Sequence, residues 1–349
     1  MILAAGNRSG LVKLWRAVPN TAEFQMRLAL LLLSAGQKSD AQTIFSELLA
    51  SHPDPAHAAQ YRQQFAAACC RRGVSILGDE KSGNGIAEFS KAIELDPNCA
   101  MYWRWRGRQY YRLAQWEEAI ADYTRAIQLQ PDVPRYWSNR AAAYAEQNQW
   151  EKAAADTEQL VDLAPHACVG YYQLALIRLA ANDTDAYRAI VTRMLKRFGD
   201  SNDPEQANWL AWTCALAPDA VSDLASPIAC GKFAAESDSE SISYLNSLGA
   251  ILYRAGQVNS SVNWLTKADT LAKKQQRKAS FTPPYTWYFL SMAYHHLGND
   301  TEAKKWLEQA NNRCHKLFNK HKNGTPSLPW DRRLTLKLLR DAAETRIDG

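Results

Sequence analysis

Three features that would place this chain in a membrane or outside the cell are missing from its sequence. No apolar run approaches the ~20 residues that a membrane-spanning helix needs, and Leu28–Leu33 shows how short these runs are. The N-terminus has neither the basic segment nor the long apolar segment of a secretory signal. The seven cysteines form no C-x-x-C pair. We therefore expect a cytoplasmic protein with no membrane partner and with reduced, mostly buried thiols.

The sequence also lacks the motifs of catalysis. It contains no glycine-rich phosphate loop, no kinase catalytic loop and no G-x-S-x-G nucleophile motif. The nearest approach to a metal-ligand cluster, His295 and His296 with Cys314 and His315, matches the spacing of no common zinc module. These absences predict a protein that is not an enzyme, with no cofactor and no metal ion.

What the sequence does contain is an unusual number of large rings and an uneven distribution of charge. Its 349 residues are 46% hydrophobic and 22% charged, and they include 12 Trp, 15 Tyr and 9 Phe. The net charge of +5 conceals a basic C-terminal region, because residues 271–349 carry 15 basic and 7 acidic side chains. We interpret the basic cluster at 273–278 as a solvated loop or helix end rather than a nucleic-acid surface.

A pattern of seven positions recurs with a period of 34 residues. The pattern places two rings on one face of a first helix and small residues where a second helix must approach it. A proline then ends the second helix. In the segment that begins at Ala100 these positions are Trp103, Gly107, Tyr110, Ala119, Tyr123, Ala126 and Pro131. In the segment that begins at Pro134 they are Trp137, Ala141, Tyr144, Ala153, Thr157, Leu160 and Pro165.

This pattern closely resembles the tetratricopeptide (TPR) repeat. Weaker copies lie at 22–55, 66–99, 168–201, 242–275 and 284–317, and residues 204–237 read as a helix pair interrupted by the loop 217–223. The resemblance implies an all-α, right-handed solenoid of about seven helical hairpins with one concave groove. We expect an N-terminal array over 17–202, a degenerate C-terminal array over 203–317, and a loop and capping helix over 318–349, with the helix itself at 329–346.

Residues 1–16 carry a second resemblance. Two short apolar runs flank Asn7–Gly10, as in a β-hairpin, and the segment is similar to the last two strands of a WD-repeat blade. Ser9 and Arg16 depart from that pattern. Together with the repeats, this short N-terminal hairpin remnant resembles the C-terminal half of bacterial WD-repeat/TPR proteins, some with an upstream Ser/Thr kinase domain. We expect that the reading frame starts late or that the gene has lost its front end.

The TPR resemblance also implies a peptide-binding groove, because fixed positions of each first helix line the concave face of such arrays. In the two strongest repeats the expected groove residues are Arg104, Arg108, Tyr111, Arg112, Arg135, Ser138 and Asn139. Arg104, Arg108 and Arg112 are spaced four apart and so form one helical stripe. Arginine binds carboxylates and phosphates through paired hydrogen bonds, which suits an acidic peptide. The chaperone-tail clamp of some TPRs is matched only by Asn139 and by arginines in the preceding repeat.

The sequence leaves alternatives open. The favoured function is a non-catalytic scaffold that binds a peptide or protein segment, and a regulatory fragment of a kinase/WD-repeat signalling protein is the alternative. An RNA-binding solenoid is less favoured, because Trp103 and Tyr110 are needed for packing and few rings remain to stack on bases. The arginine stripe could also pair with acids of the chain itself, such as Glu117, Glu118 or Glu146.

Overall fold

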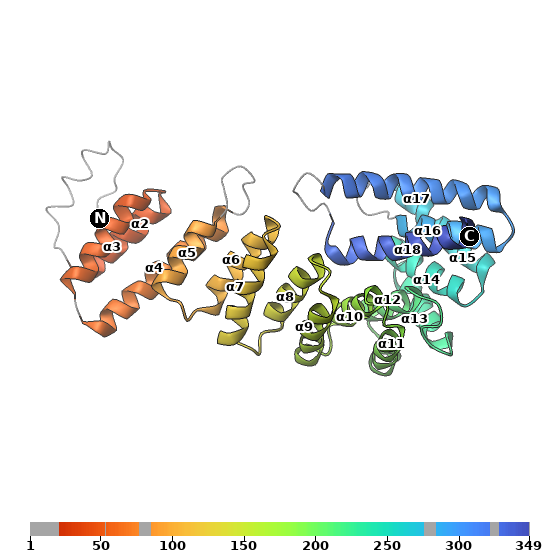
Figure 1. The fold of residues 1–349 in the computed structure, drawn as a ribbon, viewed down its shortest axis with the longest axis horizontal. Helices are drawn as coiled ribbons and strands as arrows, with labels where there is room; N and C mark the ends of the chain where they lie inside the picture. The colour runs from red at the N-terminus through yellow and green to blue at the C-terminus, as the bar shows by residue number, and fades with distance from the viewer. Residues whose placement is uncertain (1–20, 53, 77–84, 276–283, 322–327, 349) are drawn as a thin grey trace. The chain divides into compact units, whose positions relative to one another are not determined.

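The computed structural model describes residues 21–52, 54–76, 85–275, 284–321 and 328–348. All regular structure in these ranges is helical, and helices α2 to α18 follow one another along the chain (Figure 1). The all-α prediction is therefore confirmed for the described residues. The hairpin predicted within residues 1–16 lies outside them.

The chain divides into two compact units. Unit 1 comprises Met1–Tyr110 and Gln128–Gln130, and unit 2 comprises Tyr111–Ile127 and Pro131–Gly349. The helices that begin in unit 1 are α2 (Ala22–Ser34), α3 (Lys38–Ser51), α4 (Pro55–Ser75), α5 (Ile86–Leu95) and α6 (Ala100–Arg112). The boundary predicted at 202/203 falls within unit 2, between α11 and α12.

Unit 2 contains most of the helices. They are α7 (Trp116–Leu129), α8 (Pro134–Glu146), α9 (Trp150–Leu163), α10 (Cys168–Ala180), α11 (Thr184–Phe198), α12 (Pro204–Ala215), α13 (Ala225–Ser237), α14 (Ile242–Arg254), α15 (Val258–Lys274), α16 (Pro284–His296), α17 (Asp300–His321) and α18 (Trp330–Asp348). Within the units, each first helix packs on the second helix that follows it, as in α8/α9 and α14/α15. In unit 2, first helices also pack on one another, as α12 does on α10 and α14, so the pairs stack as a TPR-type solenoid does.

The chain turns from a first helix to a second through one residue in the left-handed backbone region. Glycine occupies this position at Gly36 and Gly256, with φ of 88° and 73°. Asparagine, which tolerates this region, occupies it at Asn148 and Asn182, with φ of 56° and 58°. The same turn geometry therefore recurs in hairpins whose sequences differ.

Small residues stand where the two helices of a hairpin come closest. A Cβ atom on Gly73 of α4 would lie 2.7 Å from the ring of Phe89 in α5. A Cβ atom on Gly249 of α14 would lie 2.6 Å from Leu265 in α15. Both glycines occupy the repeat position at which the sequence predicts a small side chain, so the predicted register is confirmed in these two hairpins.

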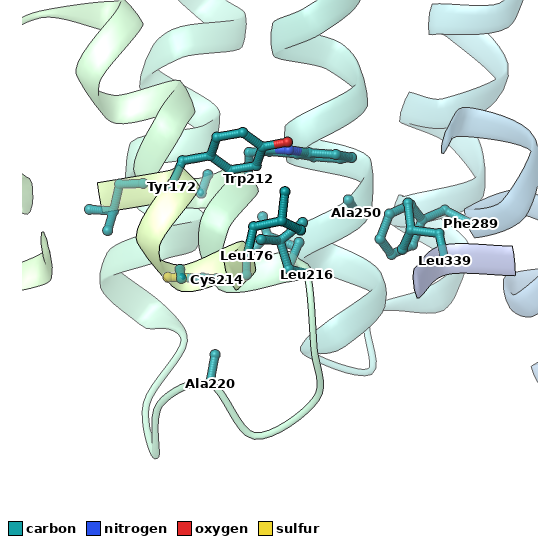
Figure 2. Close-up of a cluster of buried hydrophobic side chains, with 14 of the residues drawn as sticks. Tyr172, Leu176, Trp212, Cys214, Leu216, Ala220, Ala250, Phe289 and Leu339 are labelled. Carbon is teal, nitrogen blue, oxygen red and sulfur yellow. The ribbon is translucent and has the colours of Figure 1, made fainter. Parts of the chain in front are cut away.

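Each unit has its own hydrophobic core. In unit 1 the rings of Phe45 and Phe65 stack with centroids 4.3 Å apart. The larger core of unit 2 is built by first and second helices together with α18 (Figure 2). Leu339 of α18 is fully buried in it. The last helix thus contributes buried side chains to the core of unit 2.

The cysteines are thiols, as the sequence predicts. All seven are free, and six of them are buried. Burial raises the pKa of Cys69 to about 12 and that of Cys70 to about 11. These thiols stay protonated at neutral pH and behave as small apolar side chains.

Candidate interaction site

The predicted groove residues are divided between the two units, with Arg104 and Arg108 in unit 1 and the others in unit 2. In unit 1, the guanidinium groups of Arg104 and Arg108 both lie over the indole of Trp105, at 4.7 Å and 5.2 Å from its centroid. Trp105 itself stacks on the buried ring of Phe89, with centroids 6.2 Å apart. Core packing thus holds the indole, and the indole in turn orients the two arginines.

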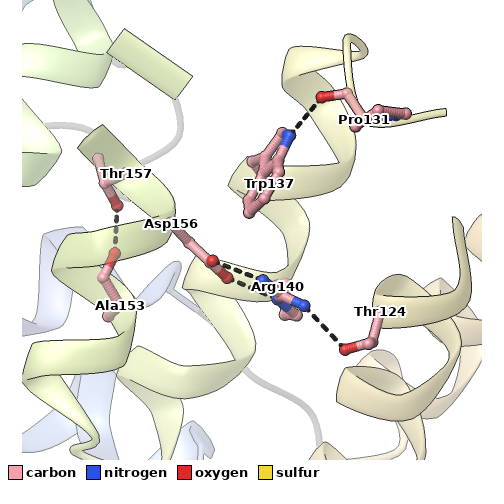
Figure 3. A network of polar contacts seen from close by, with 7 residues as sticks. All are labelled: Thr124, Pro131, Trp137, Arg140, Ala153, Asp156 and Thr157. Atoms are coloured by element: carbon pink, nitrogen blue, oxygen red, sulfur yellow. Dashed lines mark hydrogen bonds and ion pairs between the residues drawn. The ribbon is translucent and has the colours of Figure 1, made fainter. Parts of the chain in front are cut away.

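Another arginine of a first helix, Arg140, makes contacts that stabilise the fold. Arg140 of α8 donates two hydrogen bonds of 2.7 Å to the two carboxylate oxygens of Asp156 in α9, and one of 3.0 Å to Thr124 Oγ1 in α7 (Figure 3). The hydrogen bonds that Arg140 donates to Asp156 raise the pKa of Arg140 above its ordinary value. Nearby, Trp137 Nε1–H donates to the carbonyl of Pro131 at 2.7 Å. The contacts of Arg140 link α7, α8 and α9. They account for the presence of an arginine at this position without any ligand.

In unit 2, the predicted groove residue Tyr111 is already engaged. Its hydroxyl donates to Glu146 Oε1 at 3.0 Å, and its ring meets that of Trp116 edge-on at 4.9 Å. Burial, reinforced by the charge of Glu146, raises the pKa of Tyr111. The other carboxylate oxygen of Glu146 pairs with Arg333 of α18. One of the acids considered as a partner for the arginine stripe therefore bonds Tyr111 and Arg333.

The remaining predicted residues differ in exposure. Arg112 and Arg135 are exposed, whereas Ser138 and Asn139 are half-buried. Asn139 Nδ2 is buried and makes no hydrogen bond. Of these residues, the arginines are thus accessible to solvent, whereas the amide nitrogen of Asn139 is not.

Helix α18 supplies residues that the sequence did not single out. It packs on α16 and α17, as a capping helix would, and it also reaches α10 and α8. Tyr172 of α10 and Thr335 share a hydrogen bond of 2.7 Å between their hydroxyl oxygens, and Arg346 bonds the hydroxyl of Tyr253 in α14. The apolar spacing of this segment predicts a helix, but nothing in the sequence indicates which distant helices it covers.

A cavity of about 330 Å³ lies where the first turns of α18 meet α10, α12, α14 and α16. Its walls include the rings of Tyr172, Trp209, Trp212 and Tyr285, together with Asp331 and Leu336. Asn208, which also lines it, is only 6% exposed, and its Oδ1 accepts no hydrogen bond. Burial raises the pKa of Asp331, although the backbone N–H of Arg332 donates to it at 2.9 Å.

Among the described residues, no three His, Cys, Asp or Glu side chains converge as the ligands of a metal ion would. None of the helices they form combines the length and the apolar character that crossing a membrane requires.

Family comparisons agree with this architecture. A profile described as TPR repeat matches residues 107–148, and three profiles described as tetratricopeptide repeat match residues 23–55, 134–167 and 284–313. The chain contains tetratricopeptide repeats. These four matches begin at residue 23, so the WD-repeat resemblance of residues 1–16 stays a prediction. No curated protein sequence is similar to this TPR-containing chain.

Solved structures align with this chain at low sequence identity. A tetratricopeptide repeat protein from Parabacteroides merdae is 12% identical with a TM-score of 0.51, over 79% of this chain and 99% of that one. Yeast Tom70 is 16% identical with a TM-score of 0.42, over 88% of this chain and 58% of Tom70. The first TPR domain of Spaghetti (RPAP3), solved with an HSP90 peptide, is 24% identical with a TM-score of 0.32, over 34% of this chain and 95% of that domain. The first of these, with a TM-score above 0.5, shows a likeness of fold.

Proposed function

We propose that this TPR chain is a non-catalytic scaffold and that Arg104 and Arg108 of unit 1 bind an acidic segment of a partner protein. The observation that carries the proposal is the placement of both guanidinium groups over Trp105, at 4.7 Å and 5.2 Å from the ring centroid. A long arginine side chain normally loses rotamer freedom when it binds a ligand. Contact with a packed ring reduces that loss, which favours binding.

The chemistry of these two side chains indicates the class of partner. A guanidinium group is a planar cation whose N–H groups can donate paired hydrogen bonds to a carboxylate. Arg108 is exposed, so its donors can reach a ligand. Two such groups one helical turn apart suit a segment that carries more than one Asp or Glu. In unit 2, the exposed Arg112 and Arg135 are candidates for the same role.

Charge reversal tests the proposal. The double variant Arg104→Glu with Arg108→Glu should lose at least about tenfold in affinity for a fluorescein-labelled peptide of alternating Asp and Glu, because two attractive charges become repulsive. Fluorescence anisotropy at 0.1 M and 1 M salt measures the effect. The difference between the variant and the unaltered chain should shrink at 1 M, where the screening length falls to ~3 Å.

The matched control changes the same net charge elsewhere in unit 1. Arg62 and Arg71 are exposed on α4, and Arg62→Glu with Arg71→Glu should leave peptide affinity close to that of the unaltered chain. Equal losses in both double variants would mean that only net charge matters, and the assignment to Arg104 and Arg108 would be wrong. Circular dichroism confirms that each variant is folded.

The same arginines and ring could also stack on bases, and a gel shift separates the two partner classes. Single-stranded RNA bound through phosphates must lose affinity steeply with salt, in proportion to the number of contacts. If RNA binds more tightly than the acidic peptide and shows this slope, the partner is a nucleic acid and the scaffold proposal fails.

A further inference from the structure

Resting on the proposed scaffold function, we propose that unit 2 has a binding site for an amphipathic helix of a partner protein and that α18 occupies this site in the free chain. We call this site the α18 site and define it by the residues that bond α18 from three first helices. They are Glu146 of α8, Tyr172 of α10 and Tyr253 of α14. The partner helix exchanges with α18.

The first support is that α18 meets unit 2 as a helical ligand meets a groove. Leu336, Leu339 and Ala343 lie three and four residues apart, so they share one face, and each is at most 1% exposed. Recognition of an amphipathic helix by a groove commonly uses anchors at this spacing. The anchored face is short, and side chains nearer the two ends of the helix make its polar bonds.

The polar bonds fix the direction of the bound helix. Near its beginning, Arg333 pairs with Glu146, which lies 187 residues earlier in the chain. Near its end, Arg346 bonds Tyr253, which lies 93 residues earlier. A helix of opposite direction would place neither arginine at its acceptor. The α18 site therefore selects orientation as well as amphipathic character, which a passive cap does not require.

The second support is that α18 fits the site incompletely. The cavity of about 330 Å³ lies beside Leu336 and is walled by the rings of Tyr172, Trp209 and Trp212. Asn208 Oδ1 lies buried there with no donor. Unfilled space and an unpaired buried acceptor both cost free energy. A better occupant would place a larger side chain with an N–H group at the position of Leu336.

Tryptophan meets both requirements, since it is larger than leucine and its indole carries one hydrogen-bond donor. We therefore expect the partner helix to carry a tryptophan beside the cavity, three residues after an arginine that reaches Glu146. The four aromatic walls suit an indole, because aromatic pairs attract one another beyond their burial. This pattern of arginine and tryptophan is the chemical signature of the partner.

Two synthetic peptides test the exchange on the full chain. Both carry the sequence of residues 328–348 and a fluorescein label, and one of them has the substitution Leu336→Trp. The Trp peptide should bind at least about tenfold more tightly than the unsubstituted peptide, because it fills the cavity and satisfies Asn208. At saturation it should accelerate hydrogen exchange of the α18 amides while those of α12 and α14 keep their protection.

Weakening α18 in the chain provides a second measurement. Arg333→Ala with Arg346→Ala removes two bonds to the α18 site without changing the site itself, so both peptides should bind more tightly than they do to the unaltered chain. Lys337→Ala with Arg340→Ala is the matched control, because Lys337 is exposed and the ion pairs of Arg340 are with Asp341 and Glu344 of α18. This control should leave both affinities unchanged.

The proposal is overturned if the Trp peptide binds no better than the unsubstituted one and leaves the exchange of α18 unaltered. In that case α18 is a permanent part of the fold. The outcome of this peptide experiment does not depend on the test of the proposed function. That test measures binding of the acidic peptide to variants of unit 1. Loss of acidic-peptide binding in Arg104→Glu with Arg108→Glu, together with unchanged binding of the Trp peptide, would show that the two sites are separate.

Discussion

Units 1 and 2 are built from the same kind of helical pair, but their first helices present different surfaces. In unit 2, Glu146, Tyr172 and Tyr253 are bonded to α18. In unit 1, Arg104 and Arg108 lie over a ring of their own helix, and Arg108 is exposed. The repeat pattern thus defines which side chains can line a surface, and in unit 2 a segment far along the chain bonds three of these side chains.

The two units also differ in how they pair buried charge. In unit 2, Asp156 receives two hydrogen bonds of 2.7 Å from one guanidinium. In unit 1, buried Glu88 is paired with Lys38, whose side chain is 48% exposed, and with Arg72 at 3.7 Å. A bidentate pair within the core constrains its helices more than a pair that reaches solvent. The largest response to a single substitution should therefore come from unit 2.

The substitution Asp156→Ala should destabilise unit 2 by ~3–5 kcal/mol, because it leaves the guanidinium of Arg140 largely buried without its partner. Chemical denaturation gives the free energy of unfolding, and hydrogen exchange should show the loss in unit 2 while α3 and α4 of unit 1 keep their protection. Asp185→Ala is the control, since Asp185 is 95% exposed in its pair with Arg188 and should contribute less than ~1 kcal/mol. Equal losses of unfolding free energy in Asp156→Ala and Asp185→Ala would contradict the role of the Arg140–Asp156 pair in stabilising unit 2.

An intermediate effect should come from matched glycines in the two units. Gly73→Ala and Gly249→Ala each place a Cβ atom within 2.7 Å of a packed side chain, which should cost ~1–3 kcal/mol. Hydrogen exchange should increase in unit 1 for the first variant and in unit 2 for the second. Gly231→Ala is the control, because its Cβ would stay 3.4 Å from its nearest neighbours and alanine favours a helix. It should be neutral or slightly stabilising.

The smallest expected effect concerns Asp331 at the start of α18. Burial raises the pKa of Asp331, so the folded state binds its proton more readily than the unfolded state does. Its ionisation therefore lowers stability as pH rises from the ordinary Asp range towards neutral. Asp331→Asn should raise the melting temperature at pH 7 and make no difference at pH 3.

The control for this pH dependence is Asp341→Asn, on the same helix, where the side chain is 51% exposed. Its melting temperature should follow that of the unaltered chain at both pH values. A higher melting temperature at pH 7 for Asp341→Asn but not for Asp331→Asn would show that burial of Asp331 does not govern the stability of α18.

Much of the fold could be predicted because the same spacing of rings and small residues recurs in several repeats. The spacing of rings and small residues predicted the helical pairs, and Gly73 and Gly249 lie where the pattern requires close approach. Trp103 and Trp137, 34 residues apart, both donate an indole hydrogen bond to a proline carbonyl, at 2.8 Å and 2.7 Å. Equal sequence positions therefore make equal contacts, because each repeat meets the same neighbours.

The candidate site could be predicted only in part. The sequence placed Arg104, Arg108 and Tyr111 on one face of a first helix, but it could not show that Tyr111 bonds Glu146 or that Glu146 also holds Arg333. That pair joins residues 187 positions apart. No local spacing encodes such a contact.

By itself, the sequence determined that this protein is helical, that its helices pair, and where those pairs approach closely, because these properties depend on periodicity and side-chain size within one repeat. Only the tertiary structure decided what covers the paired helices. It placed α18 on α8, α10, α14 and α16 and left a cavity beside Asn208. The physical reason is that such contacts depend on which surfaces come together after the chain has folded, and many surfaces of similar composition compete for one amphipathic helix.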